Sequence, residues 1–222
     1  MNSKRLLAIA SLINKDDSIV DIGCDHGYLD IYLIKNKLCK KAIASDISEN
    51  ALSQAKANIE KYNLTKKIDT VVSNGLENID VKDINTVVIS GMGTSTILNI
   101  LDNPKVDSIN KFIIQSNNNL EELRTAMNKR NYKIIKEIVV YEKGKYYTII
   151  EFVHGKEKLS TTTKLLGAYN KDNIDYYKYL YDKYKGILNK IPKYKLNKIF
   201  STLHIVIKLQ KYIIEQNNKK IN

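Results

Sequence analysis

Cysteine is scarce in this chain, since its 222 residues include only Cys24 and Cys39. Two cysteines are too few for a disulfide framework, and neither stands in a metal-binding pair. No apolar run approaches the roughly 18 residues that a membrane-spanning helix needs, and the N-terminus has no signal-peptide cleavage pattern. These shortages predict a cytoplasmic protein without a metal site or a membrane partner.

Acidic residues are scarce in the last third of the chain. Residues 155–222 hold 15 Lys against 5 Asp or Glu, which is +10 of the total formal charge of +12. A basic block beside a nearly neutral domain suggests a polyanionic partner, most often a nucleic acid. The alternative is compositional drift, because a chain this rich in Lys, Asn, Ile and Tyr is typical of AT-rich genomes.

Apolar strands alternate with amphipathic helices over the first 130 residues. We predict strands at 18–22, 41–46, 68–72, 86–90 and 111–116, and helices at 3–13, 27–37, 48–62, 94–102 and 119–130. Such alternation implies parallel β-α-β units. Residues 132–141 and 146–153 then read as a β-hairpin around Gly144. We therefore predict an α/β protein of the class I, Rossmann-like methyltransferase type, with a seven-stranded, mostly parallel sheet.

The C-terminal third follows a helical period instead. After a polar linker at 154–160, apolar residues recur every three or four positions in two runs, Ile174, Tyr177, Tyr181, Tyr184, Leu188, Ile191 and Leu196, Ile199, Leu203, Val206, Gln210, Ile213. A break at residues 191–193 separates the runs and predicts an antiparallel, coiled-coil-like helical hairpin. We expect a catalytic domain over residues 1–155 and a basic helical hairpin over residues 160–222.

A glycine-punctuated turn follows the first predicted strand. Gly23 and Gly27 would let the backbone approach a ligand, and Asp46, 23 residues after Gly23, could accept hydrogen bonds from a ribose diol. The spacing differs from the dinucleotide pattern G-x-G-x-x-G. With Asp21 placed to receive an ammonium group, the turn fits S-adenosylmethionine better. The alternative is a plain strand-turn-helix with an acid, Asp25, at the helix N-terminus.

Polar and glycine residues also end the later strands. Asn74–Gly75 stands where such folds bind the adenine ring, although a plain Asn-Gly turn is the alternative. The segment Gly91–Gly93 would face the methyl group and the substrate. It lacks the Asn/Asp-Pro-Pro-aromatic box of enzymes that methylate exocyclic amines, which argues against that chemistry and is compatible with attack by a ring nitrogen. Gln115 and Asn117 carry amides suited to a base edge, or else belong to an N-cap cluster. His26 is more often a structural residue than a base.

At these motifs the sequence resembles the TrmK family, bacterial tRNA methyltransferases that act on N1 of adenine 22. The matching segments are Ser3–Leu6, Asp21–Leu29, Asn74–Glu77, Gly91–Gly93 and Gln115–Asn117. They span most of residues 3–153, and the family also carries a C-terminal helical hairpin. Four departures stand near the expected site. The family usually has Gly where this chain has Thr94 and Pro where it has Ser116, and its turn usually holds Ser and Ala where Cys24 and Gly27 stand.

The resemblance implies S-adenosylmethionine as cofactor and tRNA as partner. The helical hairpin could dimerise, but an intramolecular helix pair is simpler, so we expect a monomer. The implied cofactor-binding residues are Asp21, Gly23, Asp25, His26, Gly27, Asp46, Ile47, Asn74, Gly75, Gly91 and Met92. The implied catalytic residues are Asp25, Gln115 and Asn117. The expected tRNA contacts are Lys4, Arg5, Lys178, Lys185, Lys198 and Lys208.

The chemistry is simple because adenine N1 has a free lone pair and needs no base to remove a proton. N1 lies on the Watson–Crick edge, so the target must be unpaired or flipped out. One alternative is a methyltransferase of the same fold that acts on another RNA position, a small molecule or a protein. Another is a non-catalytic RNA-binding module, against which the intact glycine turn and Asp46 argue.

Overall fold

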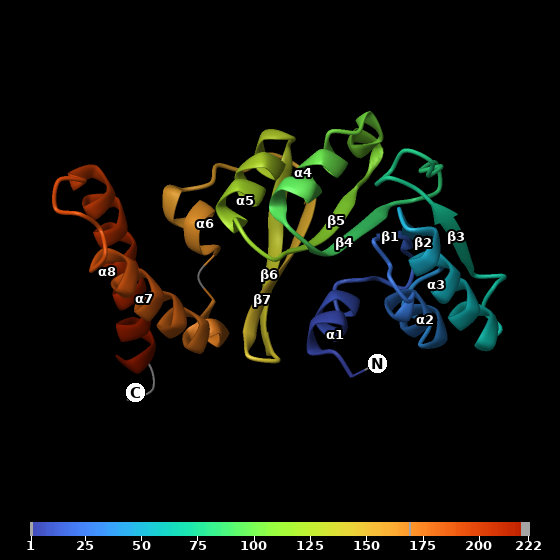
Figure 1. Ribbon diagram of the computed structural model, residues 1–222, viewed down its shortest axis with the longest axis horizontal. Coiled ribbons are helices and arrows are strands. Elements are labelled where there is room, and N and C mark those ends of the chain that lie inside the picture. Colours follow the sequence, from blue (N-terminus) through green and yellow to red (C-terminus); the bar gives the residue numbers. More distant parts are fainter. Residues whose placement is uncertain (1, 169, 219–222) are drawn as a thin grey trace. The chain divides into compact units, whose positions relative to one another are not determined.

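The computed structural model describes residues 2–168 and 170–218 (Figure 1). The chain divides into two compact units, and the division falls between Leu159 and Ser160. This break lies inside the stretch 154–160 that the sequence marks as a polar linker. The two units are described separately below.

The first unit is built on one seven-stranded sheet. Its strands are β1 (Ser18–Ile22), β2 (Lys41–Asp46), β3 (Ile68–Val72), β4 (Thr86–Met92), β5 (Lys111–Ser116), β6 (Tyr132–Glu142) and β7 (Lys145–His154). Their order is β3-β2-β1-β4-β5-β7-β6. β1 to β5 run parallel, whereas β7 is antiparallel to both β5 and β6. The predicted class I methyltransferase architecture is therefore confirmed.

Helices cover both faces of this sheet (Figure 1). They are α1 (Lys4–Ala10), α2 (Tyr28–Lys35), α3 (Glu49–Lys61), α4 (Thr94–Leu101), the 3₁₀ helix η1 (Pro104–Ser108) and α5 (Leu120–Lys129). Ile19 and Ile113 pack with α1, α2 and α3, whereas Val20 and Ile114 pack with α4 and α5. Neighbouring strand residues point to opposite faces, so each strand serves both cores.

Local chemistry sets where several helices begin. The Ser48 hydroxyl caps α3 by accepting a hydrogen bond from the Ala51 N–H at 3.3 Å, as the sequence predicts. Gly27 starts α2 with a left-handed backbone, φ +68°. A Cβ on Gly27 would lie 3.3 Å from the Cβ of Ala55, so this glycine lets α2 approach α3. The first helix is shorter than predicted, because it ends at Ala10 in turns.

A buried ion pair joins α5 to the hairpin. Arg124 donates from Nε and Nη2 to the two carboxylate oxygens of Glu137, each at 2.8 Å. Both side chains are almost fully buried. The paired geometry fixes the hairpin strand β6 against the helix that follows β5.

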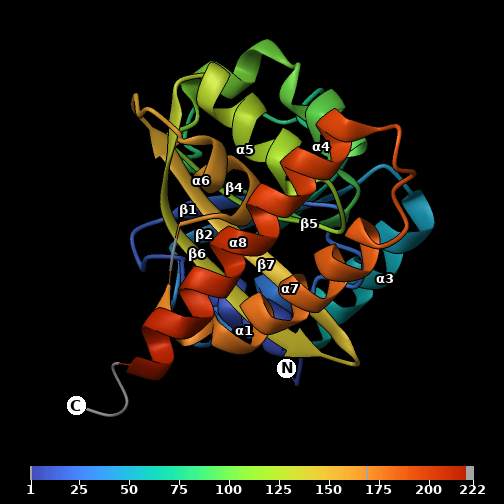
Figure 2. The same cartoon turned by 90° about the vertical axis from the view of Figure 1, so that its left-hand side faces the viewer.

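The second unit consists of α6 (Thr161–Leu166), the short 3₁₀ helix η2 (Lys171–Asn173), α7 (Ile174–Leu188) and α8 (Leu196–Asn218). The sequence did not predict α6. α7 and α8 lie side by side (Figure 2). They share a small core whose buried members are Leu166, Tyr177, Leu180, Ile205 and Leu209.

The predicted apolar seam of α8 is partly wrong. Leu203 and Gln210 are exposed, whereas Ile205 and Leu209 are buried. Apolar residues occur on more than one side of this helix, so a spacing of three and four residues fits either of two helix faces. Only packing against α7 determines which face is buried.

In the part of the chain that the structure describes, no helix is long and apolar enough to cross a membrane. The same residues contain no group of three or more His, Cys, Asp or Glu that could hold a metal ion.

Candidate functional site

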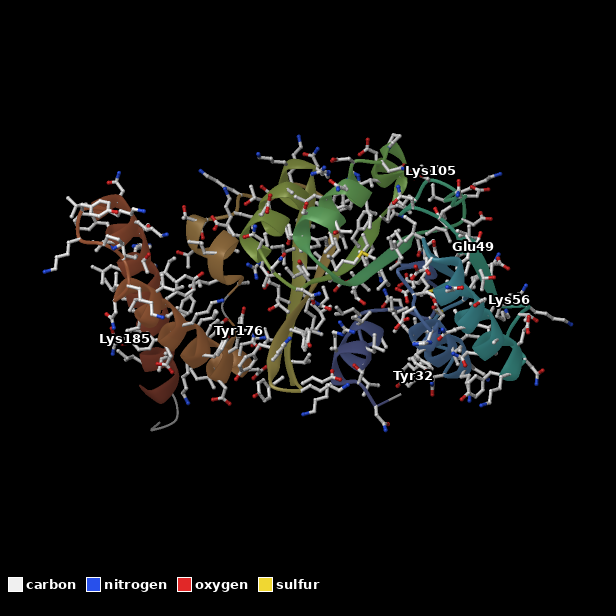
Figure 3. All side chains as sticks on the ribbon, viewed as in Figure 1. Tyr32, Glu49, Lys56, Lys105, Tyr176 and Lys185 are labelled. Atoms are coloured by element: carbon white, nitrogen blue, oxygen red, sulfur yellow. The ribbon has the colours of Figure 1, made fainter. Side chains whose placement is uncertain are left out.

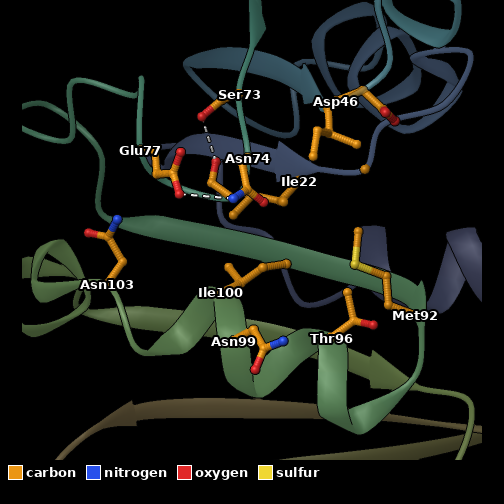
Figure 4. A pocket seen from close by; sticks show the side chains of 13 residues that line it. Ile22, Asp46, Ser73, Asn74, Glu77, Met92, Thr96, Asn99, Ile100 and Asn103 are labelled. Atoms are coloured by element: carbon orange, nitrogen blue, oxygen red, sulfur yellow. Dashed lines mark hydrogen bonds between the residues drawn. The ribbon is translucent and has the colours of Figure 1, made fainter.

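A pocket of about 320 Å³ opens at the carboxyl ends of the parallel strands (Figure 4). Six residues expected to bind the cofactor line it: Gly23, Asp46, Ile47, Asn74, Gly75 and Met92. The sequence did not single out its other lining residues, which are Ile22, Ser73, Glu77, Thr96, Asn99, Ile100 and Asn103. Open parallel sheets bind ligands at this edge.

Asp46 ends β2 with its carboxylate at this pocket. Its Oδ1 accepts a hydrogen bond from the Ser48 N–H at 2.9 Å, and its Oδ2 accepts one from the Asp25 N–H at 3.4 Å. These bonds orient the carboxylate and leave lone pairs on both oxygens. Two adjacent hydroxyls, such as those of a ribose, fit this arrangement of acceptors.

Gly23 forms the floor of the pocket next to Met92. Its backbone is left-handed at φ +78°, and a Cβ there would overlap the Cε methyl of Met92. Its N–H donates to the Ser45 carbonyl at 2.8 Å, which ties the turn to β2. A side chain at this position would therefore be strained, and the end of the Met92 side chain would have to move.

The loop after β3 forms the opposite wall. The Asn74 amide donates to Glu77 at 2.9 Å, and the Ser73 hydroxyl donates to the Gly75 carbonyl at 3.0 Å (Figure 4). The ammonium of Lys105, labelled in Figure 3, donates to the carbonyls of residues 76, 77 and 79 at 3.1, 2.8 and 2.7 Å. Three bonds from one cation hold this wall in place.

Asp21 lies on the other face of the sheet, next to α1 and α2, and is not among the lining residues. Burial raises its pKa from 3.8 to about 7, the Asp46 carboxylate adds to the rise, and Arg5 opposes it. On the neighbouring helix α2, Asp30 is fully buried, and neither of its carboxylate oxygens has a hydrogen-bond partner. Burial, then repulsion from Asp21, raises the pKa of Asp30 well above its usual value. A cation at this end of the turn would relieve the repulsion.

Four other residues expected at the cofactor, namely Asp25, His26, Gly27 and Gly91, lie outside the pocket lining. The missing side chain of Gly27 faces α3, so helix packing by itself accounts for that glycine. Asp25 has a left-handed backbone, φ +52°, and its side chain is 74% exposed. The His26 Nε2 lies 3.5 Å from the Asp25 carboxylate.

A second pocket of about 330 Å³ adjoins the first. It is lined by Arg5, Ser116, Asn117, Lys145, Tyr146 and Tyr147. The Asn117 N–H donates to the Met92 carbonyl at 2.9 Å, and its side-chain amide donates to the Gly91 carbonyl at 2.7 Å. Met92 lines the first pocket and Asn117 lines the second, so the bond between them links the two linings.

Arg5 belongs to this second pocket, although its sequence position suggested a contact with RNA phosphate. Its Nη1 donates to the Gln115 side-chain oxygen at 2.9 Å, and its guanidinium lies over the Tyr147 ring, 5.3 Å from the centroid. Its backbone N–H donates to Glu142 at 2.8 Å, and this bond lowers the pKa of that carboxylate. The first helix is thereby tied to the tip of the β6–β7 hairpin.

Sequence reasoning missed Lys145, Tyr146 and Tyr147. They come from a hairpin that follows the strand–helix repeats, and nothing in their local spacing marks them as site residues. The usable signal is long-range, because Gln115 pairs with Ile149 across β5 and β7. That register puts the residues just before Ile149 beside the end of β5.

The lysines expected to contact tRNA have varied surroundings. Lys4 and Lys198 are exposed, and Lys208 is half-buried. Lys178 lies 3.4 Å from Asp175, and the Lys185 ammonium lies over the Tyr181 ring at 5.5 Å. Their contacts with RNA stay a prediction.

Comparison with known proteins supports the methyltransferase fold. Residues 2–150 match the family model described as a methyltransferase domain. The fold and the pocket together define a class I methyltransferase. A relative from Mycoplasma genitalium is 35% identical over 167 residues, covering 73% of this chain and 75% of the relative.

Two further relatives carry specific names. The tRNA (adenine(22)-N(1))-methyltransferase of Bacillus subtilis is 33% identical over 150 residues, covering 67% of this chain and 63% of that protein. The solved structure of M. capricolum TrmK with S-adenosylhomocysteine is 37% identical, has a TM-score of 0.84, and covers 96% of this chain and 98% of that one. The chain belongs to the TrmK family.

Proposed function

We propose that this protein transfers the methyl group of S-adenosylmethionine to N1 of adenine 22 in the D-arm region of tRNA. The observation that supports the proposal is a pair of pockets whose linings are linked by the hydrogen bond from Asn117 to Met92. One has the acceptors and the glycine turn that suit the cofactor. The other has aromatic and amide groups that suit a base. We also propose that the enzyme acts as a monomer in the cytoplasm.

The residues at the first pocket fit the cofactor. Asp46 has free lone pairs for the ribose, Gly23 leaves the floor open, and the loop at Asn74 and Gly75 would border the adenine. Asp21 and Asp46 supply negative charge near the expected ammonium. S-adenosylmethionine supplies an electrophilic methyl group on a sulfonium when it is bound.

The reaction forms a bond from N1 to the methyl carbon and breaks the bond from that carbon to sulfur, whose electron pair stays on sulfur. Positive charge passes from sulfur to the adenine ring, and no proton leaves. The protein must therefore align two ligands and exclude water, a contribution worth several kcal/mol, about 7–11 in the best-aligned cases. We assign Asp25, at the rim of the turn, to stabilise the cationic product.

The substrate follows from access to N1. This atom is closed off inside a base-paired stack, so the enzyme must take an unpaired or extruded nucleotide. Recognition should then rest on tRNA shape and phosphate contacts rather than on a long sequence. The basic second unit is our candidate for those contacts.

The test is methyl transfer from labelled S-adenosylmethionine to unmodified tRNA, followed by nucleoside mass spectrometry and mapping. We expect 1-methyladenosine at position 22, and no transfer to a tRNA that carries guanosine there. Transfer to RNA should decline steeply as salt rises. Binding of S-adenosylhomocysteine without transfer to any tRNA would instead point to a different substrate on the same fold.

A further inference from the structure

Gln115 and Asn117 have different surroundings, although both were expected to act on the substrate. Gln115 is fully buried, whereas Asn117 is exposed and lines the second pocket. A buried amide cannot touch an incoming base. The two residues must therefore have different roles.

A closed ring of hydrogen bonds joins the two amides to Gly91. The Gly91 N–H donates to Gln115 Oε1 at 3.1 Å, Gln115 Nε2 donates to Asn117 Oδ1 at 3.0 Å, and Asn117 Nδ2 donates to the Gly91 carbonyl at 2.7 Å. The ring begins at a backbone donor and ends at a backbone acceptor of the same residue. Flipping either amide would put donor against donor, so the orientation of both is fixed.

The ring also shows which groups remain for a ligand. Gln115 Oε1 accepts a second hydrogen bond, from Arg5 at 2.9 Å, and both of its acceptor positions are then filled. Asn117 Oδ1 accepts one bond within the ring and keeps one lone pair. That lone pair belongs to an exposed residue at the pocket.

Adenine presents a matching donor. Its exocyclic N6 amino group is adjacent to N1 on the Watson–Crick edge, and N1 must keep its own lone pair for the reaction. A carbonyl oxygen that accepts from N6 would hold N1 near Met92, which is bonded to Asn117 and lines the cofactor pocket. Guanine would place its O6 acceptor against this carbonyl oxygen, so no hydrogen bond would form. Its N1 carries a proton and could not attack the methyl group.

The other walls of the pocket suit a base. Tyr146 and Tyr147 from β7 provide aromatic surface, on which unstacked bases commonly pack. The Arg5 guanidinium over the Tyr147 ring restrains that ring. Lys145 at the pocket edge is exposed and can meet the phosphate of the extruded nucleotide.

We propose that the pocket beside Gly91 receives the target adenine, that Asn117 reads its N6 amino group, and that Gln115 positions Asn117. This inference rests on the proposed function and assigns the substrate end of the same site. Asn117 is the group that touches the base. Gln115 acts only through it.

The test combines an atomic change in the substrate with a change in the protein. Full-length tRNA is assembled with adenosine or with purine ribonucleoside at position 22; the latter keeps N1 and lacks the N6 amino group. Single-turnover rates are measured with the wild-type protein, with Asn117→Ala and with the control Asn110→Ala. Asn110 is an exposed asparagine at the opposite end of β5. The intrinsic reactivity of purine is the same for each protein and cancels in the comparison.

We expect the rate penalty for removing N6 to be smaller in Asn117→Ala than in the wild type, by about two- to ten-fold, the range of one neutral hydrogen bond. Asn110→Ala should show the wild-type penalty. An unchanged penalty in Asn117→Ala would overturn the assignment while leaving the proposed function intact. Failure of the wild type to methylate the adenosine tRNA would instead defeat the proposed function.

A second variant tests the positioning role and covers the case in which Asn117→Ala is inactive. Gln115→Glu keeps the acceptor for Gly91 and Arg5 but removes the donor to Asn117. We expect the N6 penalty to shrink, with unchanged affinity for S-adenosylhomocysteine. A merely structural role for Gln115 would leave the N6 penalty at its wild-type value, whatever the change in stability.

Discussion

Thr94 and Ser116 are hydrogen-bonded to each other, with 2.8 Å between their hydroxyl oxygens. Both are buried, and the Thr94 hydroxyl also donates to the Asn118 carbonyl at 2.7 Å. Both positions depart from the usual family residues. These two departures are therefore one structural change, in which a pair of hydroxyls joins the start of α4 to the end of β5.

This contact predicts coupled effects on stability. Thr94→Ala or Ser116→Ala leaves the other buried hydroxyl with one partner fewer, at a cost of about 1–3 kcal/mol. The double variant should cost less than the sum of the singles by at least about 0.5 kcal/mol. Urea unfolding of the four proteins measures this difference. Strict additivity would show that the two hydroxyls do not stabilise each other.

Lys105 should act on cofactor affinity without touching the cofactor. Lys105→Met keeps most of the alkyl chain and removes all three bonds to the loop after β3, so the wall at Asn74 and Gly75 loses its support. We expect the Kd for S-adenosylhomocysteine to rise about ten-fold, equal to one charged hydrogen bond. The control is Lys82→Met, at an exposed lysine nearby. Calorimetric titration of both variants with S-adenosylhomocysteine measures the two Kd values. Equal Kd values would contradict a supporting role of Lys105 in cofactor binding.

Asp46 should be the main polar determinant of cofactor binding. Asp46→Asn keeps the shape but points an amide N–H at a backbone N–H and removes an acceptor for the ribose. We expect the Kd for S-adenosylhomocysteine to rise at least ten-fold, since an unpaired polar group costs about 1–3 kcal/mol. The exposed Asp83 provides the control Asp83→Asn. Wild-type affinity in a folded Asp46→Asn protein would remove Asp46 from the site.

Asp21 predicts a pH dependence whose sign follows from its environment. Its pKa in the folded protein, about 7, lies above the usual 3.8 because the side chain is buried. The folded state therefore holds a proton that the unfolded chain releases, and this stabilisation is lost as pH rises from about 4 to about 7. Asp21→Asn should be more stable than the wild type at pH 8. Below pH 8, its free energy of unfolding should change less with pH than that of the wild type.

Cofactor affinity should change in the opposite direction. If the ionised Asp21 attracts the ammonium, the affinity of the wild type for S-adenosylhomocysteine should increase as pH rises through about 7. Asp21→Asn should show weaker binding without this increase. Titrations at pH 6, 7 and 8 with both proteins test the two statements, and parallel pH profiles would argue against an electrostatic role.

The lysines at the α7–α8 connection should contribute to tRNA affinity. Lys190, Lys193, Lys195 and Lys198 are all exposed. Changing all four to Gln should weaken tRNA binding and reduce the slope of log K against log salt by about 0.7–0.9 for each lost phosphate contact. The matched control changes four exposed lysines of the first unit, Lys56, Lys61, Lys66 and Lys67. Equal losses in both variants would indicate nonspecific attraction.

The sequence predicted the sheet well because the signals that mark buried strands are local in the sequence. Buried parallel strands are short apolar runs, and the five at the start of the chain begin where predicted, with β4 longer by two residues at its end. Asp46 and Gly23 were identified for the same reason, since a strand end and a turn fix where they lie. Residues whose role depends on a distant partner, such as Lys105 and Tyr147, carried no such local signal.

Two residues make packing contacts that their sequence context did not predict. Gly27 was expected at the cofactor, and its missing side chain faces Ala55 on α3. Arg5 was expected to contact tRNA, and it also bonds to Gln115, 110 residues away in the sequence. Charge and flexibility show what a residue can do, and only the packed fold selects its partner.

The bonds at residues 91–92 have a thermodynamic consequence. Because Met92 lines the first pocket and Gly91 anchors both amides, a shift of this segment on filling one pocket would change the free energy of filling the other. Such coupling is reciprocal, so the factor by which S-adenosylhomocysteine changes the affinity for tRNA must equal the factor by which tRNA changes the affinity for S-adenosylhomocysteine. A coupling factor above one would make the spent enzyme hold its two products together, and turnover would then be limited by their release.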